Sequence, residues 1–183
     1  MIMRNTIAML IVGLLLSPLS GLAAEPPPHE ALYHVFLESV KAQGILIHRN
    51  AGIANNGVEP SNTRRNIYVP IEGVVLIYNY ADNELVKCVI EIDEHTYAFD
   101  HFPEILACFI LSVDDLSTTY DEAQALETHL IETLSVPEFP ATPTSHANRG
   151  YVQLKLSTFF LSESIKEDGS EKTMRLIQLT ASF

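Results

Sequence analysis

Hydrophobic and polar residues alternate along residues 84–93, a period of two that is typical of a strand with one buried and one wet face. The positions predicted to be buried are Val86, Cys88, Ile90 and Ile92. Another β-rich run, residues 73–80, precedes this strand across a short polar turn, so the two runs predict an antiparallel hairpin. Residues 151–161 and 173–183 flank the turn segment KEDGSEK and predict a closing hairpin.

Helical spacing of apolar residues marks three further segments. Residues 29–43 follow a run of prolines and predict an amphipathic helix. Residues 103–112 are apolar on all sides, as in a helix inside a core. Residues 120–134 carry one apolar stripe, and Thr119 with Glu122 fits a capping box at its start.

Two segments show neither the strand period of two nor the helical spacing of apolar residues. Residues 49–66 are rich in glycine and asparagine and predict a long polar loop, and residues 136–150 hold three prolines and predict a crossing loop. We also expect short strands at residues 45–48 and 96–99. Because short turns rather than helical crossovers join neighbouring strands, we predict an α+β fold: an antiparallel sheet of roughly five to six strands packed against an N-terminal helix and a central helix pair.

Residues 1–24 have the pattern of a secretory signal peptide. Arg4 precedes an uncharged apolar core, residues 7–16, which is shorter than the roughly 20 residues of a membrane span. Glu25 rather than a cysteine follows the small residues of the cleavage site, which argues against a lipid anchor. We therefore expect one globular domain, residues 25–183, in the periplasm or outside the cell, without a membrane anchor.

The chain is acidic, with a formal net charge of −12 at pH 7. This charge repels nucleic acid and anionic lipid at long range and attracts basic surfaces. The composition therefore excludes nucleic acid as a partner and favours a protein partner, a basic one if charge selects it. The alternative is that the charge serves solubility alone. No cofactor motif is present in the sequence.

Cys88 and Cys108 are the only cysteines. Export to an oxidising compartment predicts a disulfide between them, which would close a loop of about 20 residues and stabilise the fold by about 3 kcal/mol. The alternative is two buried thiols, because both cysteines lie in strongly apolar segments.

The segment EIDEHTYAFDH, residues 91–101, resembles a metal or acid/base site in composition. If this segment is extended, however, the α-carbons of His95 and His101 lie about 20 Å apart, too far to share one zinc ion. Asp100 and Glu104 lie near the start of the helix predicted at residues 103–112, where negative charge is favourable. We therefore expect no metal site here, and His95, Asp100 and His101 remain the candidate ligands if the chain reverses between them.

No catalytic residue is expected from the other motifs. His29 and His34 are five residues apart, so on a helix their rings diverge by about 140°. Cys88 lies among valine and isoleucine in a strand, unlike a reactive thiol. The sequence contains no nucleophile elbow, no phosphate-binding loop and no dinucleotide fingerprint.

A candidate binding surface consists of three tyrosines, Tyr78, Tyr80 and Tyr97, on neighbouring predicted strands, and the basic pair Arg64 and Arg65 in the predicted loop. Tyrosine provides a large contact area at low entropic cost, which suits recognition of a protein. The alternative for the tyrosines is packing within the fold.

The run from VVLIYNYADNELVKCVIEID through the helix pair to LSVPEF, residues 74–139, resembles the front, non-catalytic part of the caspase-like CHAT domains. Residues 138–183 contain no counterpart of the half of that family that carries the catalytic histidine and cysteine. The resemblance therefore implies no activity.

These observations favour an exported small acidic binding protein without catalysis, such as an inhibitor, an immunity-type protein or an adaptor of the cell envelope. One alternative is a small periplasmic hydrolase, with or without a metal, that uses the histidine and aspartate residues around 93–104 or His34. Another is an accessory subunit of an envelope assembly that binds through an unpaired sheet edge. The sequence identifies neither the partner, nor a substrate, nor the oligomeric state.

Overall fold

The structure is a computed structural model of the 183-residue chain. It describes residues 28–48, 53–58, 63–114, 119–134, 142–164 and 171–183. The predicted signal peptide, residues 1–24, lies outside the described residues.

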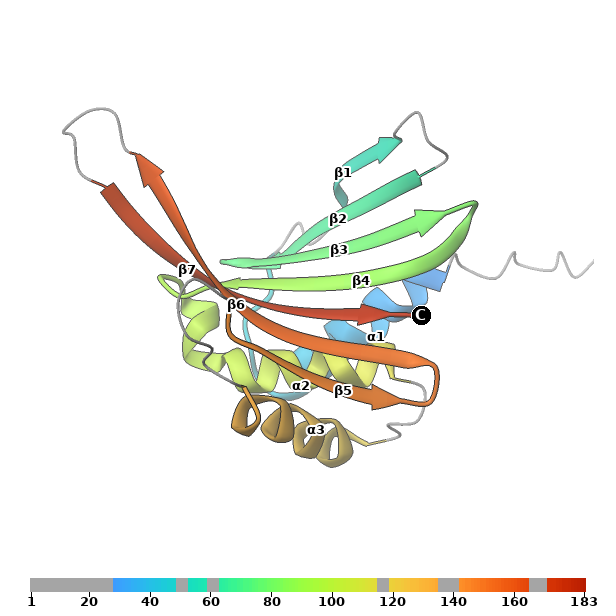
Figure 1. The fold of residues 1–183 in the computed structure, drawn as a ribbon. Helices are drawn as coiled ribbons and strands as arrows, with labels where there is room; N and C mark the ends of the chain where they lie inside the picture. Colours follow the sequence, from blue (N-terminus) through green and yellow to red (C-terminus); the bar gives the residue numbers. More distant parts are fainter. Residues whose placement is uncertain (1–27, 49–52, 59–62, 115–118, 135–141, 165–170) are drawn as a thin grey trace, which may run out of the picture.

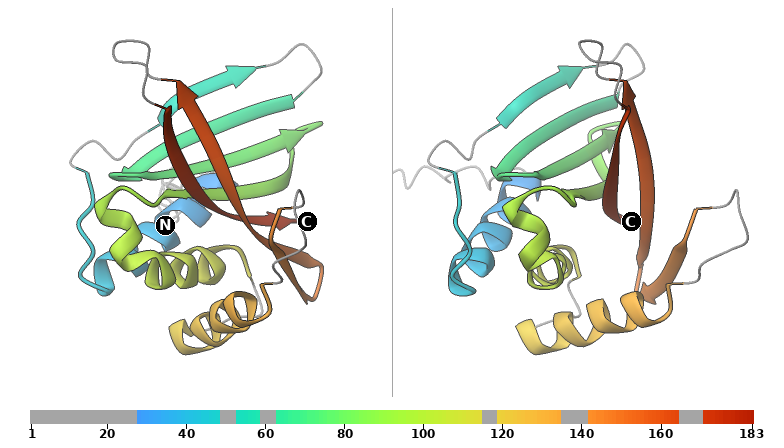
Figure 2. Two further views of the ribbon diagram at one scale, coloured as in Figure 1. Left: turned by 60° about the vertical axis from the view of Figure 1, so that its left-hand side comes forward. Right: turned by 90° about the vertical axis from the view of Figure 1, so that its left-hand side faces the viewer.

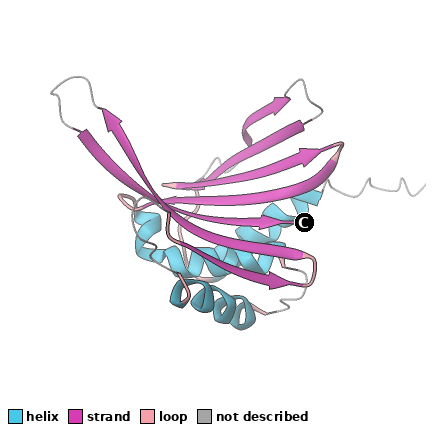
Figure 3. Ribbon diagram, in the orientation of Figure 1, coloured by secondary structure: helices cyan, strands magenta, loops and turns pink. Residues whose placement is uncertain are grey.

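The described elements form three α-helices, one short 3-10 helix and a seven-stranded sheet (Figures 1 and 3). The helices are α1 (Pro28–Ala42), η1 (Tyr97–His101), α2 (Phe102–Val113) and α3 (Tyr120–Glu132). The strands are β1 (Ile53–Val58), β2 (Thr63–Ile71), β3 (Val74–Ala81), β4 (Glu84–Asp93), β5 (Thr144–Arg149), β6 (Val152–Ser164) and β7 (Glu171–Ser182). They lie in the order β1-β2-β3-β4-β7-β6-β5, and all neighbouring strands are antiparallel. The predicted α+β class with an antiparallel sheet, an N-terminal helix and a helix pair is confirmed.

All three α-helices lie on one side of the sheet, which bends around them (Figures 1 and 2). α2 contacts α1 on one side and α3 on the other, and its apolar residues fill the space between the helices and the sheet. Its central position explains why residues of α2 are buried all round. The opposite face of the sheet points away from the helices.

The β3–β4 hairpin follows the predicted alternation, with one correction. Asp82 and Asn83 form its turn and have positive φ angles of 51° and 68°, as a tight hairpin turn requires. The pairing shifts register near the turn, where Asn79 pairs with Lys87 and the next residue pairs with Leu85. The shift leaves Val86, predicted to be buried, 38% exposed, and Leu85 takes its place against the core.

Two segments predicted to be loops contain strands. β1 and the first residues of β2 occupy much of the predicted loop 49–66, and β5 occupies the end of the predicted loop 136–150. Within the described residues, β1 and β5 are the two edge strands of the sheet, each paired on one side only. Backbone pairing holds an edge strand in place with little side-chain burial, so its sequence lacks a strong apolar pattern.

The two short strands predicted at residues 45–48 and 96–99 are absent. Residues 45–48 form no strand, although the His48 N–H donates to the Pro70 carbonyl at 2.8 Å. Residues 97–101 form η1 because Asp93 closes a turn directly after β4. Its carboxylate accepts from the His95 N–H, and its carbonyl accepts from the Thr96 hydroxyl.

The three predicted helices are confirmed, with ends that differ from the predicted ones by at most two residues. α1 ends before Gly44, which has a φ of 75° in the left-handed region that favours glycine. α3 begins with the predicted capping box, in which the Thr119 hydroxyl accepts from the Glu122 N–H and the Glu122 carboxylate accepts from the Thr119 N–H. The closing hairpin predicted at 151–161 and 173–183 is the pair β6–β7.

Candidate binding surface

The five residues of the predicted binding surface lie in three different places. Tyr78 and Tyr80 point from β3 toward the helices and are 0% and 3% exposed, so they belong to the core, which is the packing alternative. Tyr97 lies on η1, where its ring packs against His101 with centroids 4.8 Å apart. The structure therefore does not bring the three tyrosines together on one surface.

The two arginines point to opposite faces of β2. The guanidinium of Arg64 lies over the ring of Tyr80, 4.4 Å from its centroid, on the side that faces α1. Arg65 is exposed on the other face, where its Nε donates to the side-chain carbonyl of Asn79 at 3.3 Å. Only Arg65 belongs to the face of the sheet that points away from the helices.

A polar cluster lies beneath the first turn of α1, around the buried imidazole of His29. Its Nδ1 is 2.6 Å from the hydroxyl of Tyr80, and its Nε2 is 2.9 Å from the amide nitrogen of Asn66. The rings of Tyr68 and Tyr78 pack against it with centroids about 6 Å away. Burial lowers the pKa of His29 and raises that of Tyr68 to about 12, so both groups are neutral at pH 7.

This cluster has a structural role. Its side chains are all buried. Its hydrogen bonds join α1 to β2 and β3, which fixes the position of the N-terminal helix on the sheet.

The face of the sheet that points away from the helices, here called the open face, carries polar side chains in rows that cross the strands. The first row runs through Arg65, Asn79, Lys87, Ser182, Gln153 and Asn148. The second row contains Val89, Thr180, Lys155 and His146. The third row contains Glu91, Gln178, Ser157 and Thr144. Residues in one row lie on adjacent strands, about 5 Å from their neighbours.

A cleft of about 330 Å³ lies on the open face over β4, β7, β6 and β5. Lys87, Lys155 and His146 line it, together with hydroxyl and amide side chains that include Thr180 and Gln178. No aspartate or glutamate lines the cleft among the described residues. The nearest carboxylate in the rows is Glu91, which accepts a hydrogen bond from the Gln178 amide at 2.8 Å. The cleft therefore concentrates donors and positive charge on a protein of net charge −12.

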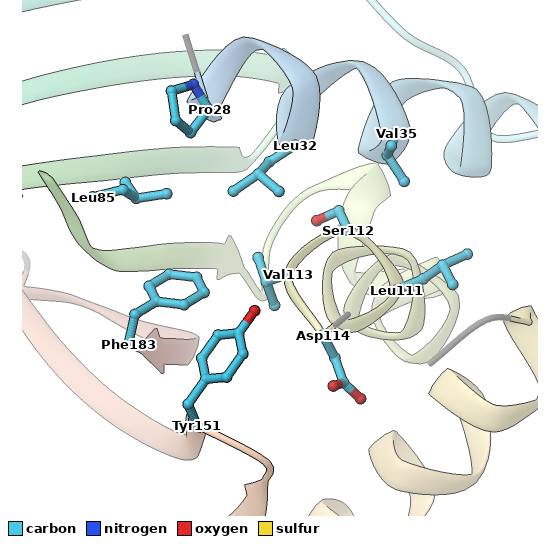
Figure 4. A pocket seen from close by; sticks show the side chains of 10 residues that line it. All are labelled: Pro28, Leu32, Val35, Leu85, Leu111, Ser112, Val113, Asp114, Tyr151 and Phe183. Carbon is cyan, nitrogen blue, oxygen red and sulfur yellow. The ribbon is translucent and has the colours of Figure 1, made fainter. Parts of the chain in front are cut away.

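A second, apolar groove of about 400 Å³ lies between α1, the end of α2 and the C-terminus of the chain (Figure 4). Leu32 and Val35 line it from α1, and Tyr151 and Phe183 line it from the sheet side. Tyr151 is 63% exposed, so the groove presents apolar surface to its surroundings.

The buried carboxylate of Asp114 lies in the wall of this groove at the end of α2. Its side chain is 0% exposed, and its Oδ2 accepts from the Nε of Arg149 at 3.2 Å. Because Arg149 already neutralises this charge, the carboxylate serves the docking of β5 onto the end of α2.

The segment EIDEHTYAFDH is explained by structural contacts. Glu94 accepts from the Arg175 N–H of β7 at 3.0 Å and lies 3.8 Å from the ring of the exposed His95. Asp100 is exposed, and His101 packs against Tyr97. Within the described residues, no three histidine, cysteine, aspartate or glutamate side chains converge as a metal site would require.

Two glutamates come together in the contact between α2 and α3. Glu127 is buried, with the hydroxyl of Thr128 donating to its Oε2 at 3.2 Å. Burial, together with the negative charge of Glu104, raises the pKa of Glu127 to about 6. Within the described part of the chain, its Oε1 has no hydrogen-bond partner. The pair therefore favours a protonated Glu127 at mildly acidic pH.

Cys88 and Cys108 are free thiols in the structure, which is the second alternative for this pair. Cys88 faces the core from β4 beside Tyr78, and Cys108 lies on α2 near Glu104. Burial raises the pKa of both thiols, that of Cys108 to about 12, so neither is a thiolate at neutral pH.

Sequence reasoning missed Lys87, Lys155 and His146 as a group. Lys87 and Lys155 alternate with apolar neighbours and were identifiable as positions on the wet face of a strand, whereas His146 lies in the segment 136–150 that was predicted to be a loop. Their proximity depends on the strand order β4-β7-β6-β5, which the sequence pattern does not specify. The open-face cleft is therefore a candidate site that the fold reveals and that the sequence did not predict.

No family model, no curated protein and no solved structure matches the chain, so the resemblance of residues 74–139 to CHAT domains gains no support. Among the described helices, none has the length and apolar composition needed to cross a membrane.

Proposed function

We propose that this protein is an exported binding protein without catalysis and that its partner docks on the open face. The observation that carries the proposal is the polar cleft on the one sheet face that no described helix covers. A polar face of this extent, with basic side chains directed outward, provides the hydrogen-bond donors of a protein interface. A partner docked on the open face would cover the second face of the sheet, because the helices already cover the first.

The rival proposal of a hydrolase is less well supported by the positions of its residues. His95 and Asp100 are exposed at different points of the turn and η1, and His34 is exposed on α1. In the cleft, His146 faces Lys155 across the β5–β6 pair rather than a carboxylate that would orient it as a base. The accessory-subunit proposal stays compatible with the fold, because β1 and β5 each have an edge without a neighbour among the described strands.

The test compares three forms of the exported chain, each immobilised and exposed to envelope extract at low salt. They are the wild type, a Lys87→Glu/Lys155→Glu variant of the open face and a Lys41→Glu control. Lys41 is an exposed lysine of α1, 2.7 Å from Glu38, on the other side of the molecule. We expect a protein retained by the wild type and the control but lost from the open-face variant, as measured by quantitative mass spectrometry. Equal retention on all three forms would reject docking on the open face.

A further inference from the structure

We propose that the open-face cleft binds the carboxylate side chains of an acidic, extended segment in the partner. This inference rests on the proposed function and adds the chemistry of the partner. It is opposite in sign to the expectation drawn from net charge, which favours a basic partner. Net charge acts on a partner at long range, whereas the side chains that line the contact decide which groups are bound there.

The charges around the cleft are complementary to carboxylates. Lys87 and Lys155 are both exposed, and neither forms an ion pair with a carboxylate of the described residues. His146 stands directly beside Lys155 on β5. Against these groups the rows hold one acid, Glu91, whose carboxylate is already engaged by Gln178. An incoming carboxylate therefore meets free donors and little opposing charge.

The register sets the distance between the two lysines. Lys87 pairs with Ser182, which pairs with Gln153, so Lys87 and Gln153 lie two strands apart in the first row. Lys155 lies two residues along β6 in the second row. Strand spacings of about 4.8 Å and a rise of about 3.4 Å per residue put the two lysine α-carbons about 12 Å apart. Two lysine side chains can reach one carboxylate held midway between them.

Hydroxyl and amide groups fill the interval between the lysines. Ser182 and Thr180 lie on β7, the strand between the two lysines, and Gln153 lies beside Lys155 on β6. A carboxylate accepts up to about four hydrogen bonds, more than two ammonium groups supply at this spacing. The neighbouring hydroxyl and amide donors can satisfy the remainder, which makes the interval suited to a carboxylate rather than to an apolar side chain.

An acidic protein segment fits these features better than a nucleic acid. The chain carries a net charge of −12, which opposes a densely charged polyanion, and Glu91 adds a negative charge beside the cleft. Among the described residues, Phe159 on β6 and the imidazole of His146 on β5 are the aromatic rings that line the cleft, too few for a row of consecutive stacked bases. Carboxylates that are spaced along an extended chain can contact the lysines without placing a high density of negative charge beside Glu91.

The experiment uses two fluorescent peptides that alternate serine with glutamate or serine with glutamine, titrated with the mature protein at low salt and followed by anisotropy. We expect the glutamate peptide to bind about tenfold more tightly than the glutamine peptide. Lys87→Gln/Lys155→Gln should weaken the glutamate peptide about tenfold, and Lys41→Gln should leave it unchanged. Glu91→Gln should strengthen binding about twofold, a gain that a misfolded variant cannot produce.

Three results would overturn the inference. They are equal binding of the two peptides, an equal loss in the Lys41→Gln control, and citrate binding that matches or exceeds the peptide and depends on the same lysines. The last result would assign the cleft to a small anion. If the peptides fail while the extract partner still depends on Lys87 and Lys155, the acidic segment is rejected and the docking face stands. Failure of both experiments rejects the proposed function as well.

Discussion

The imidazole Nδ1 of His29 lies 2.6 Å from the hydroxyl oxygen of Tyr80, which joins the first turn of α1 to the end of β3. The same hydroxyl accepts a hydrogen bond from the backbone N–H of His29 at 3.2 Å. The first N–H groups of a helix have no partner within the helix, so Tyr80 satisfies a group that α1 itself leaves open. One side chain of the sheet therefore fixes both the start of the helix and its position.

We expect Tyr80→Phe to destabilise the fold by about 1–3 kcal/mol, because it leaves the buried ring nitrogen and the N–H of His29 without this partner. The measurement is urea unfolding at pH 7.5, where His29 is neutral. Tyr97→Phe removes a hydroxyl from the partly exposed η1 and serves as the control, with an expected change within about 0.5 kcal/mol. Equal effects of the two variants would show that the His29–Tyr80 contact contributes nothing specific.

We expect Glu127→Gln to stabilise the protein at neutral pH and to leave it unchanged near pH 4. The pKa of Glu127 is raised to about 6, so the folded state binds its proton more tightly than the unfolded state. The stability gained from that proton is complete below the unfolded pKa of about 4.5 and is lost as the pH rises through 6. The glutamine side chain of the variant is neutral at every pH and does not lose this stability, which amounts to about 2 kcal/mol.

The measurement is the difference in unfolding free energy between Glu127→Gln and the wild type from pH 4 to pH 7.5. A difference is needed because the lowered pKa of His29 acts in the opposite sense, with stability lost as the pH falls below 6.5. Glu132→Gln, at an exposed position of the same helix, should give a flat difference. If the difference in unfolding free energy for Glu127→Gln were equally independent of pH, this would contradict the raised pKa of Glu127.

The elements that the sequence predicts correctly are those in which burial of one face imposes a regular spacing of apolar residues. The β3–β4 hairpin, the closing hairpin and all three α-helices bury a continuous face, so their apolar positions recur at the spacing of the structure. β1 and β5 are missed because an edge strand is held by backbone bonds on one side, and turn-forming residues such as Asn55 and Asn56 are tolerated in it. Periodicity also gives Tyr78 and Tyr80 one common face, but it does not say that α1 covers that face.

The candidate site is less predictable because it is assembled from strands far apart in the chain. Lys87 comes next to residues of β7 and β6 through the pairing of Lys87 with Ser182 and of Ser182 with Gln153. Alternation identifies Lys87 and Lys155 as outward-facing, but the same alternation is compatible with any order of the strands. The pairing of β4 with β7 depends on the whole sheet, because it follows from the way the seven strands together cover the helices.

We expect both cysteines of the folded protein to be free and unreactive. Cys88 and Cys108 are fully buried thiols with raised pKa values, so an aromatic disulfide reagent should titrate neither in the native state. Unfolding in guanidinium without a reductant should release two reactive thiols. A protein recovered from an oxidising compartment that shows none after unfolding would instead contain the Cys88–Cys108 disulfide, and its mass would be lower by two hydrogens.

Two glycines with the same backbone conformation differ in their surroundings and provide a matched pair of substitutions. Gly44 follows α1 with a φ of 75°, and a Cβ there would meet no atom within 4 Å. Gly73 joins β2 to β3 with a φ of 81°, and a Cβ there would overlap the side chain of Thr96 at its Oγ1. Thr96 cannot move away cheaply, because its hydroxyl donates to the Asp93 carbonyl in the turn after β4.

We therefore expect Gly44→Ala to cost about 1 kcal/mol, the strain of a left-handed alanine. Gly73→Ala should cost about 3 kcal/mol or more, because the same strain is joined by a steric clash that displaces the turn. Urea unfolding measures both, and Gly73→Ala with Thr96→Gly should recover the part due to the clash but not the part due to strain. Equal costs for the two single variants would show that Thr96 does not pack against Gly73, and would remove the contact that holds η1 against the β2–β3 turn.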